Sequence, residues 1–90
     1  MCAKVTSYVL VVTDVGKEHE VVKELLNIEG VTVAQTVYGE FDVLTKVDCE
    51  NLKDLDAAIT KIRKINGIIR TMTLISGWML EMFPGLAKIG

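Results

Sequence analysis

The segment from Tyr38 to Asp42 holds the residues of this sequence that are best suited to binding a small charged molecule. Gly39 leaves the backbone N–H groups of a sharp turn unshielded, and such groups can bind a carboxylate. The Asp42 carboxylate follows shortly after the turn and can accept a charge-assisted hydrogen bond from an ammonium group. A zwitterionic amino acid needs both contacts, so the segment predicts a site for one. The alternative is an ordinary hairpin in which Asp42 is exposed on an early strand position.

Two further side chains, His19 and Cys49, are candidates for catalysis or redox chemistry, but the residues around each of them favour a structural role. His19 is the only histidine and has carboxylates near it. Successive helix positions point about 100° apart and no nucleophile accompanies it, so we interpret it as part of a solvated helix start. Cys49 lies near the start of a predicted helix, but neighbouring carboxylates oppose a low thiol pKa, so we expect a buried or half-buried residue. The pair Gly16-Lys17 lacks the full spacing of a phosphate-binding loop.

Length and composition exclude several protein classes and favour an oligomer. Ninety residues form at most one domain, which buries only about two-thirds of the surface that the unfolded chain exposes. Cys2 and Cys49 form no short-spaced pair and no secretory signal precedes them, so no disulfide framework is expected. One histidine and two cysteines cannot form a closed zinc site, and no cofactor is predicted. Because 50% of the residues are apolar, we expect association between subunits to supply stability.

The charge balance and the apolar runs indicate a soluble cytoplasmic protein. A formal net charge of -2 argues against nucleic-acid binding by this chain, because such proteins normally carry a basic stripe. The longest apolar run, Tyr8 to Val12, is far shorter than the roughly 20 residues that span a bilayer. We therefore expect neither a nucleic-acid partner nor a membrane segment.

Hydrophobic patterning predicts four strands and two helices. The continuous apolar run from Tyr8 to Val12 is typical of a central strand covered on both faces. Asn51 is a good helix N-cap with Asp54 three positions on, and Gly39 suits the first central position of a two-residue type II′ turn. The predicted order is strand 8–12, helix 17–29, strand 31–38, strand 41–47, helix 51–66, strand 68–75 and a tail 77–90. The apolar helix faces predicted from three- and four-residue spacing are Val21, Val22, Leu25, Leu26 and Ile28 in the first helix, and Leu52, Leu55, Ile59, Ile62 and Ile65 in the second.

The order β-α-β-β-α-β contains an internal repeat, because Ile28-Glu29-Gly30-Val31 and Ile65-Asn66-Gly67-Ile68 match in pattern. Two β-α-β halves joined by a hairpin predict an α+β, ferredoxin-like fold with a four-stranded antiparallel sheet and both helices on one face. The other face is left bare, yet the strands carry apolar residues of both parities, such as Val43 and Leu44. We therefore infer that the free face packs on a second subunit to form a dimer.

These segments together resemble the effector-binding (RAM, or ACT-like) domain of the Lrp/AsnC family of transcriptional regulators, over about residues 7–76. The specific parts are a Gly-x-x-Asp element at Gly39 and Asp42 and a Thr-x-Thr element at Thr71 and Thr73. The resemblance implies dimers formed by sheet-to-sheet packing, octamers or rings of dimers, and amino-acid effectors bound between dimers. The effector-binding residues that we predict on this basis are Tyr38, Gly39, Glu40, Asp42, Thr71 and Thr73.

The sequence departs from the full-length regulators, because only Met1 to Ser7 precede the first strand and leave no room for a helix-turn-helix. We expect a stand-alone sensor domain over residues 1–76 that is not an enzyme. Such a domain acts by co-assembly with full-length Lrp/AsnC regulators, or through another partner, rather than by binding DNA itself. Residues 77–90 are interpreted as a tail, an arm that packs on a neighbouring subunit.

Two alternative functions remain open at this point. The first is a small dimeric α+β barrel enzyme, such as an oxygenase or a haem-binding protein, which commonly places His, Trp or Asn between sheet and helices. This sequence offers mainly Val, Leu and Ile in that layer. The second is a purely structural assembly module that binds no ligand. An absorbance spectrum tests for haem, and a thermal-shift screen of the amino acids separates a sensor from a structural module.

Overall fold

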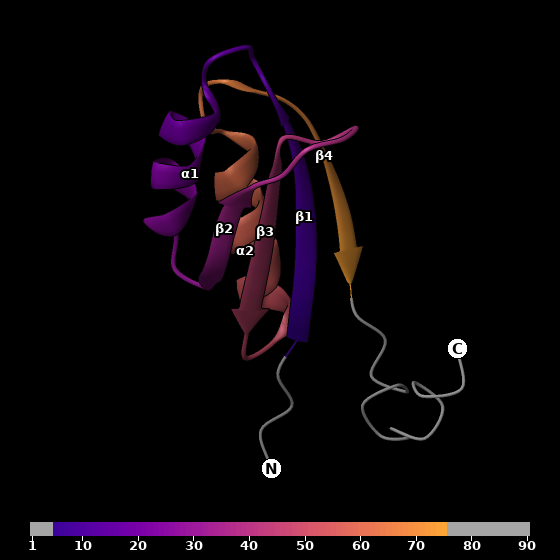
Figure 1. The fold of residues 1–90 in the computed structure, drawn as a ribbon. Helices are drawn as coiled ribbons and strands as arrows, with labels where there is room; N and C mark the ends of the chain where they lie inside the picture. The colour runs from indigo at the N-terminus through magenta and orange to yellow at the C-terminus, as the bar shows by residue number, and fades with distance from the viewer. Residues whose placement is uncertain (1–4, 76–90) are drawn as a thin grey trace, which may run out of the picture.

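The computed structural model describes residues 5–75, which form one sheet and two helices (Figure 1). Their order along the chain is the predicted β-α-β-β-α-β. The predicted tail 77–90 and Cys2 lie outside the described residues. The elements are β1 (Val5–Thr13), α1 (Glu18–Leu26), β2 (Val31–Thr36), β3 (Val43–Cys49), α2 (Leu52–Arg63) and β4 (Ile68–Ile75).

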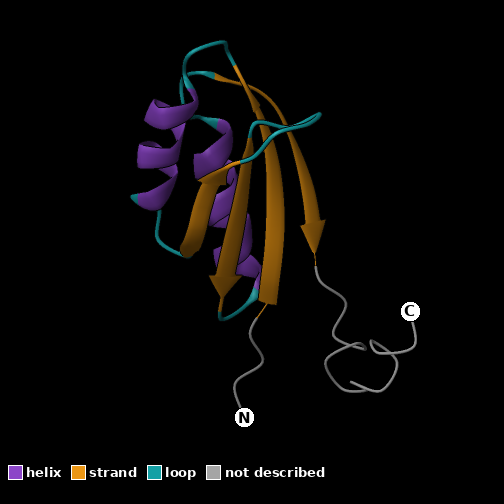
Figure 2. Ribbon diagram, viewed as in Figure 1, coloured by secondary structure: helices purple, strands orange, loops and turns teal. Residues whose placement is uncertain are grey.

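The strands form one antiparallel sheet in the order β2-β3-β1-β4, and both helices cover the same face of it (Figure 2). Because successive side chains of a strand point to opposite faces, Val43 is fully buried beneath the helices, whereas Leu44 lies on the other face. This arrangement confirms the ferredoxin-like α+β fold. The apolar core consists of Val9, Val11, Val21, Leu25, Val43, Val47, Cys49, Leu55, Ala58 and Ile62.

Each helix buries a narrower stripe than its periodicity predicts. Val21 and Leu25 of α1 are fully buried, but Leu26 is 51% exposed and Leu52 of α2 is 63% exposed. The prediction was wrong for these two leucines because each helix packs on the sheet along one side. Leu26 lies about 100° around the helix from Leu25, and Leu52 is the first residue of its helix. Among residues 5–75, neither helix is long and apolar enough to cross a membrane.

The connection between β2 and β3 is longer than the predicted two-residue turn. β2 ends at Thr36 and β3 begins at Val43, and the N–H of Val37 donates to the carbonyl of Asp42 at 2.9 Å. The hairpin is confirmed, but the type II′ turn was wrong. The N–H of Asp42 donates to the carbonyl of Val11 at 2.8 Å. The start of β3 is therefore held by β1, and the chain before it forms a wider loop.

The predicted internal repeat is present in the backbone. Gly30 and Gly67 both have φ of +102°, a conformation that side chains other than glycine rarely adopt. Their carbonyl oxygens accept equivalent hydrogen bonds, from the N–H of Asp48 at 2.8 Å and from the N–H of Asp14 at 2.9 Å. Each glycine thus turns the chain from a helix into an edge strand. The turn at Gly30 is held by β3, and the turn at Gly67 is held by Asp14, the residue that follows β1.

The sheet face opposite the helices, which we call the open face, carries exposed apolar side chains. Tyr8, Met72 and Leu74 are 38%, 49% and 50% exposed, and they lie together on β1 and β4. Half-buried Leu10 and Leu44 continue this surface across β1 and β3. A contiguous apolar surface on a small protein commonly marks an interaction site.

Candidate functional site

Asp42 lies where the hairpin meets β1, and its carboxylate is half-buried and held in position. Its Oδ2 accepts a hydrogen bond from the N–H of Thr13 at 2.9 Å, in addition to the backbone bond from Asp42 to Val11. Its Oδ1 has no hydrogen-bond partner within the described part of the chain. Asp42 is therefore not the exposed strand residue of the alternative interpretation, and one of its oxygens can still accept a bond from a ligand.

Tyr38, Gly39 and Glu40 form the tip of the hairpin, and all three are exposed. Gly39 has φ of +137°, and a Cβ built there would meet no atom within 4 Å among the described residues. The space beside Gly39 is therefore open, and the exposed tip of the hairpin faces solvent in one protomer. A second subunit would be needed to exclude water from this turn.

Thr71 and Thr73 lie on β4 opposite Val11 and Val9, whose side chains are buried beneath the helices. Both threonines therefore belong to the helix-covered face of the sheet, where Thr71 is half-buried and Thr73 is exposed at the sheet edge. β1 separates them from Asp42. Within one protomer the structure does not bring these hydroxyls to the hairpin, and their use together with it stays a prediction.

Sequence reasoning missed Arg70, which the structure places against the hairpin. Its guanidinium carbon lies 5.9 Å from the centroid of the Phe41 ring, a cation–π distance. The hairpin reaches across β1 toward β4, which brings the ring to the arginine (Figure 1). Val12 pairs with Arg70 and Thr13 pairs with Ile68, so β4 bulges by one residue beside the arginine. A signal existed in the sequence, because Arg70 is the single charged residue of β4.

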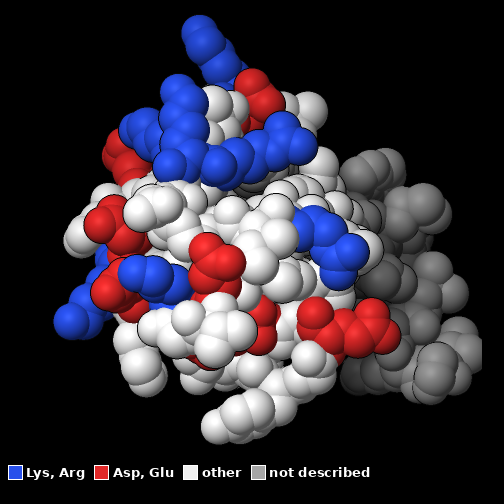
Figure 3. Space-filling model, turned by 90° about the horizontal axis from the view of Figure 1, so that it is seen from above, with Lys and Arg blue, Asp and Glu red and all other residues white. Residues whose placement is uncertain are grey.

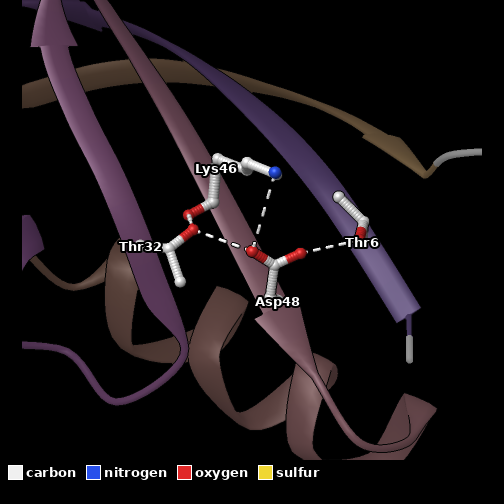
Figure 4. Close-up of polar contacts among 4 residues, drawn as sticks. All are labelled: Thr6, Thr32, Lys46 and Asp48. Atoms are coloured by element: carbon white, nitrogen blue, oxygen red, sulfur yellow. Dashed lines mark hydrogen bonds and ion pairs between the residues drawn. The ribbon is translucent and has the colours of Figure 1, made fainter. Parts of the chain in front are cut away.

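A separate polar cluster lies on the open face at the opposite end of β1. Asp48 is its centre, with Oδ1 accepting from Thr6 Oγ1 at 2.6 Å and Oδ2 accepting from Thr32 Oγ1 at 2.8 Å (Figure 4). The same Oδ2 lies 3.9 Å from Lys46 Nζ. The donors come from β1, β2 and β3, so this carboxylate joins three strands, and its oxygens are already engaged.

A cavity of about 380 Å³ opens between the end of β3 and the start of α2. It is lined by Cys49 together with the carboxylates of Glu29, Glu50 and Asp54. Cys49 is 9% exposed. Burial, reinforced by nearby carboxylates of which Asp54 is the strongest, raises the pKa of its thiol. The prediction of a buried cysteine is confirmed, and a raised pKa disfavours the nucleophilic thiolate.

The end of the molecule that carries the hairpin also carries the start of α1. His19 is exposed there, as expected for a solvated helix start, and Lys17 pairs with Glu20 at 3.5 Å. Figure 3 looks down on this end and shows Lys and Arg side chains along one edge and further ones elsewhere on the face, interspersed with Asp and Glu side chains. This end therefore does not present the continuous positive surface that duplex DNA attracts.

Comparison with known sequences identifies relatives of this chain. A family model described as the Lrp/AsnC ligand binding domain matches residues 6–77. An uncharacterized HTH-type transcriptional regulator of Pyrococcus furiosus is 33% identical over 75 residues, which are 79% of this chain and 50% of that protein. The chain thus spans about half the length of the curated relatives it matches.

Solved structures show the same fold. The hypothetical protein PHS023 from Pyrococcus horikoshii is 49% identical, with a TM-score of 0.76, and the match covers 81% of this chain and 89% of that one. The feast or famine regulatory protein from M. tuberculosis, solved in complex with L-methionine, is 22% identical, with a TM-score of 0.67 over 80% of this chain and 49% of that one. At that identity the likeness concerns the fold.

Proposed function

This chain belongs to the Lrp/AsnC ligand binding domain family, and we propose that it is an oligomeric sensor of small amino acids that regulates transcription through a partner regulator. The observation that carries the proposal is the Asp42 carboxylate, fixed by the N–H of Thr13 and left with one free oxygen beside an exposed glycine turn. A ligand ammonium binds such an oxygen through a charge-assisted hydrogen bond. The complex of L-methionine with the mycobacterial regulator, which has the same fold, supports this choice of ligand class.

The open face supports a dimer formed by two copies of this chain. Covering Tyr8, Met72 and Leu74 removes apolar area from water, which is worth about 25 cal/mol per Å² before the costs of association. We expect dimers to assemble further into octamers or rings, with the ligand held between dimers. In such an assembly a second subunit closes the hairpin site against water.

Transcriptional regulation fits the relatives of this chain, which include HTH-type regulators. Within residues 5–75 both helices pack on the sheet, an arrangement that supports a role in ligand sensing rather than in reading DNA. We propose that the sensor controls transcription by co-assembly with full-length Lrp/AsnC regulators.

A thermal-shift screen of the twenty protein amino acids tests ligand binding. We expect one or a few of them to raise the Tm by roughly 10–20 °C when present at about a hundred times their Kd. A ligand at a hundred times its Kd stabilises the folded state by about 2.7 kcal/mol, and about 1 kcal/mol moves the Tm of a domain of this size by roughly 4–8 °C. If none of the amino acids shifts the Tm, the chain is a structural assembly module and the sensor proposal is wrong.

DNA binding by this chain is expected to be absent in a mobility-shift assay at physiological salt. The physical reason is the net charge of -2 together with the mixed charges at the hairpin end (Figure 3). The assay compares the chain with and without the amino acid selected by the screen. A discrete, sequence-dependent complex formed by the chain would contradict regulation through a partner.

A further inference from the structure

Arg70 and Asp42 flank the same residue of β1 from two sides. Arg70 pairs with Val12 on the β4 side. On the β3 side Val43 pairs with Val11, and the preceding residue, Asp42, bonds the backbone of Val11 and Thr13. Neighbouring strands lie about 4.8 Å apart, so the two charged residues start from backbones separated by roughly 10 Å.

Neither the Arg70 guanidinium nor the Asp42 carboxylate forms an ion pair in the described part of the chain. The ion pairs within 4.0 Å among residues 5–75 join Lys17 to Glu20 and Lys46 to Asp48, and Arg70 belongs to neither. Asp42 uses one carboxylate oxygen for the N–H of Thr13. A guanidinium carries five N–H donors in a planar fork that matches a carboxylate, so Arg70 retains donors for one.

Two structural features hold Arg70 toward the hairpin. The Phe41 ring lies under its guanidinium carbon at 5.9 Å, and stacking on a ring face leaves the N–H edges of the guanidinium free. The bulge at Ile69 interrupts the regular pairing of β4 immediately before Arg70, and bulges commonly re-aim the neighbouring side chain. A side chain held in this way loses less freedom when a ligand binds.

We propose that Arg70 is the specificity-determining residue that selects the α-carboxylate of the ligand, while Asp42 binds its ammonium group. The inference rests on the proposed function and assigns recognition of the carboxylate to a side chain in addition to the turn around Gly39. A zwitterion with one charge-assisted hydrogen bond at each end spans on the order of 8 Å from acceptor to donor. That span is of the same order as the backbone separation of roughly 10 Å between Asp42 and Arg70 across β1.

Calorimetry with paired ligands tests this assignment. The probes are the amino acid that binds best in the thermal-shift screen and its α-carboxamide, which keeps the ammonium group and lacks the carboxylate. We expect wild-type protein to prefer the amino acid at least tenfold. Arg70→Gln is expected to lose most of this preference, with the affinity for the carboxamide unchanged, and Arg70→Lys is expected to retain a larger part of it. Arg63→Gln, which removes an exposed arginine of α2, is the control and should keep the full preference.

The outcomes separate this inference from the proposed function. Failure of wild-type protein to bind any amino acid rejects the proposed function and this inference with it. If wild-type protein binds an amino acid and Arg70→Gln keeps the full preference for it over the carboxamide, the role assigned to Arg70 is rejected and the proposed function stands. An equal loss of affinity for both probes in Arg70→Gln also rejects it, because Arg70 then supports the hairpin. A changed oligomeric state with an unchanged preference rejects it as well, because Arg70 then pairs with a second subunit.

Discussion

Val43→Asp is expected to unfold the chain, whereas Leu44→Asp is expected to leave it folded. Val43 is fully buried beneath the helices, between Val11 of β1 and Thr36 of β2. An uncompensated charge buried at such a position costs about 3–5 kcal/mol. The total stability of a domain is about 5–15 kcal/mol, and small domains lie toward the low end. Circular dichroism during urea titration measures the loss, which includes any stability contributed by the dimer.

Leu44→Asp is the matched control, because the adjacent residue lies on the open face and carries the same new charge. We expect it to separate the dimer into folded monomers, since a carboxylate facing the second subunit would be desolvated without a partner. Sedimentation at micromolar concentration distinguishes monomer from dimer. A wild-type protein that is monomeric under these conditions would exclude the sheet-face dimer. Unfolding of Leu44→Asp with survival of Val43→Asp would show that the faces of β3 are reversed.

Asp42→Asn is expected to weaken amino-acid binding roughly ten- to a hundredfold while preserving the fold. Loss of one charge-assisted contact costs on the order of 1.5–3 kcal/mol, which corresponds to that change in Kd. The asparagine side-chain oxygen still accepts the bond from the N–H of Thr13, which in wild type is 2.9 Å long. Calorimetry gives the affinity, and urea unfolding checks that stability is retained.

Asp42→Ala separates the two roles of this carboxylate. It should weaken binding as strongly as the asparagine variant and also lower stability by about 1–3 kcal/mol, because the half-buried N–H of Thr13 loses its acceptor. Asp56→Asn, which removes an exposed carboxylate of α2, controls for the change in net charge and should change neither quantity. Wild-type affinity in both Asp42 variants would make Asp42 a structural residue of the hairpin and refute the site.

The order and type of the elements could be read from the sequence because they depend on local chemistry. A continuous apolar run, β-rich composition and alternation predicted the strands, and period-3.6 spacing predicted the helices. Asn51 caps α2 as predicted, with its Oδ1 accepting the N–H of Asp54 at 2.8 Å. Gly30 and Gly67 marked the two equivalent turns because their backbone conformation disfavours other residues. Each of these signals acts within a few residues of the chain.

Tertiary structure alone decided which face of each strand is covered and which charges meet. Alternation shows that Val43 and Leu44 point to opposite faces, but only the packing of the helices settles which one is buried. Likewise, nothing within the hairpin indicates that Phe41 lies beneath Arg70. That contact depends on β1 pairing with β3 on one side and β4 on the other, and on the loop reaching across it. Contacts between distant segments follow from strand order and from the burial of a shared core, so no local pattern in the sequence records them.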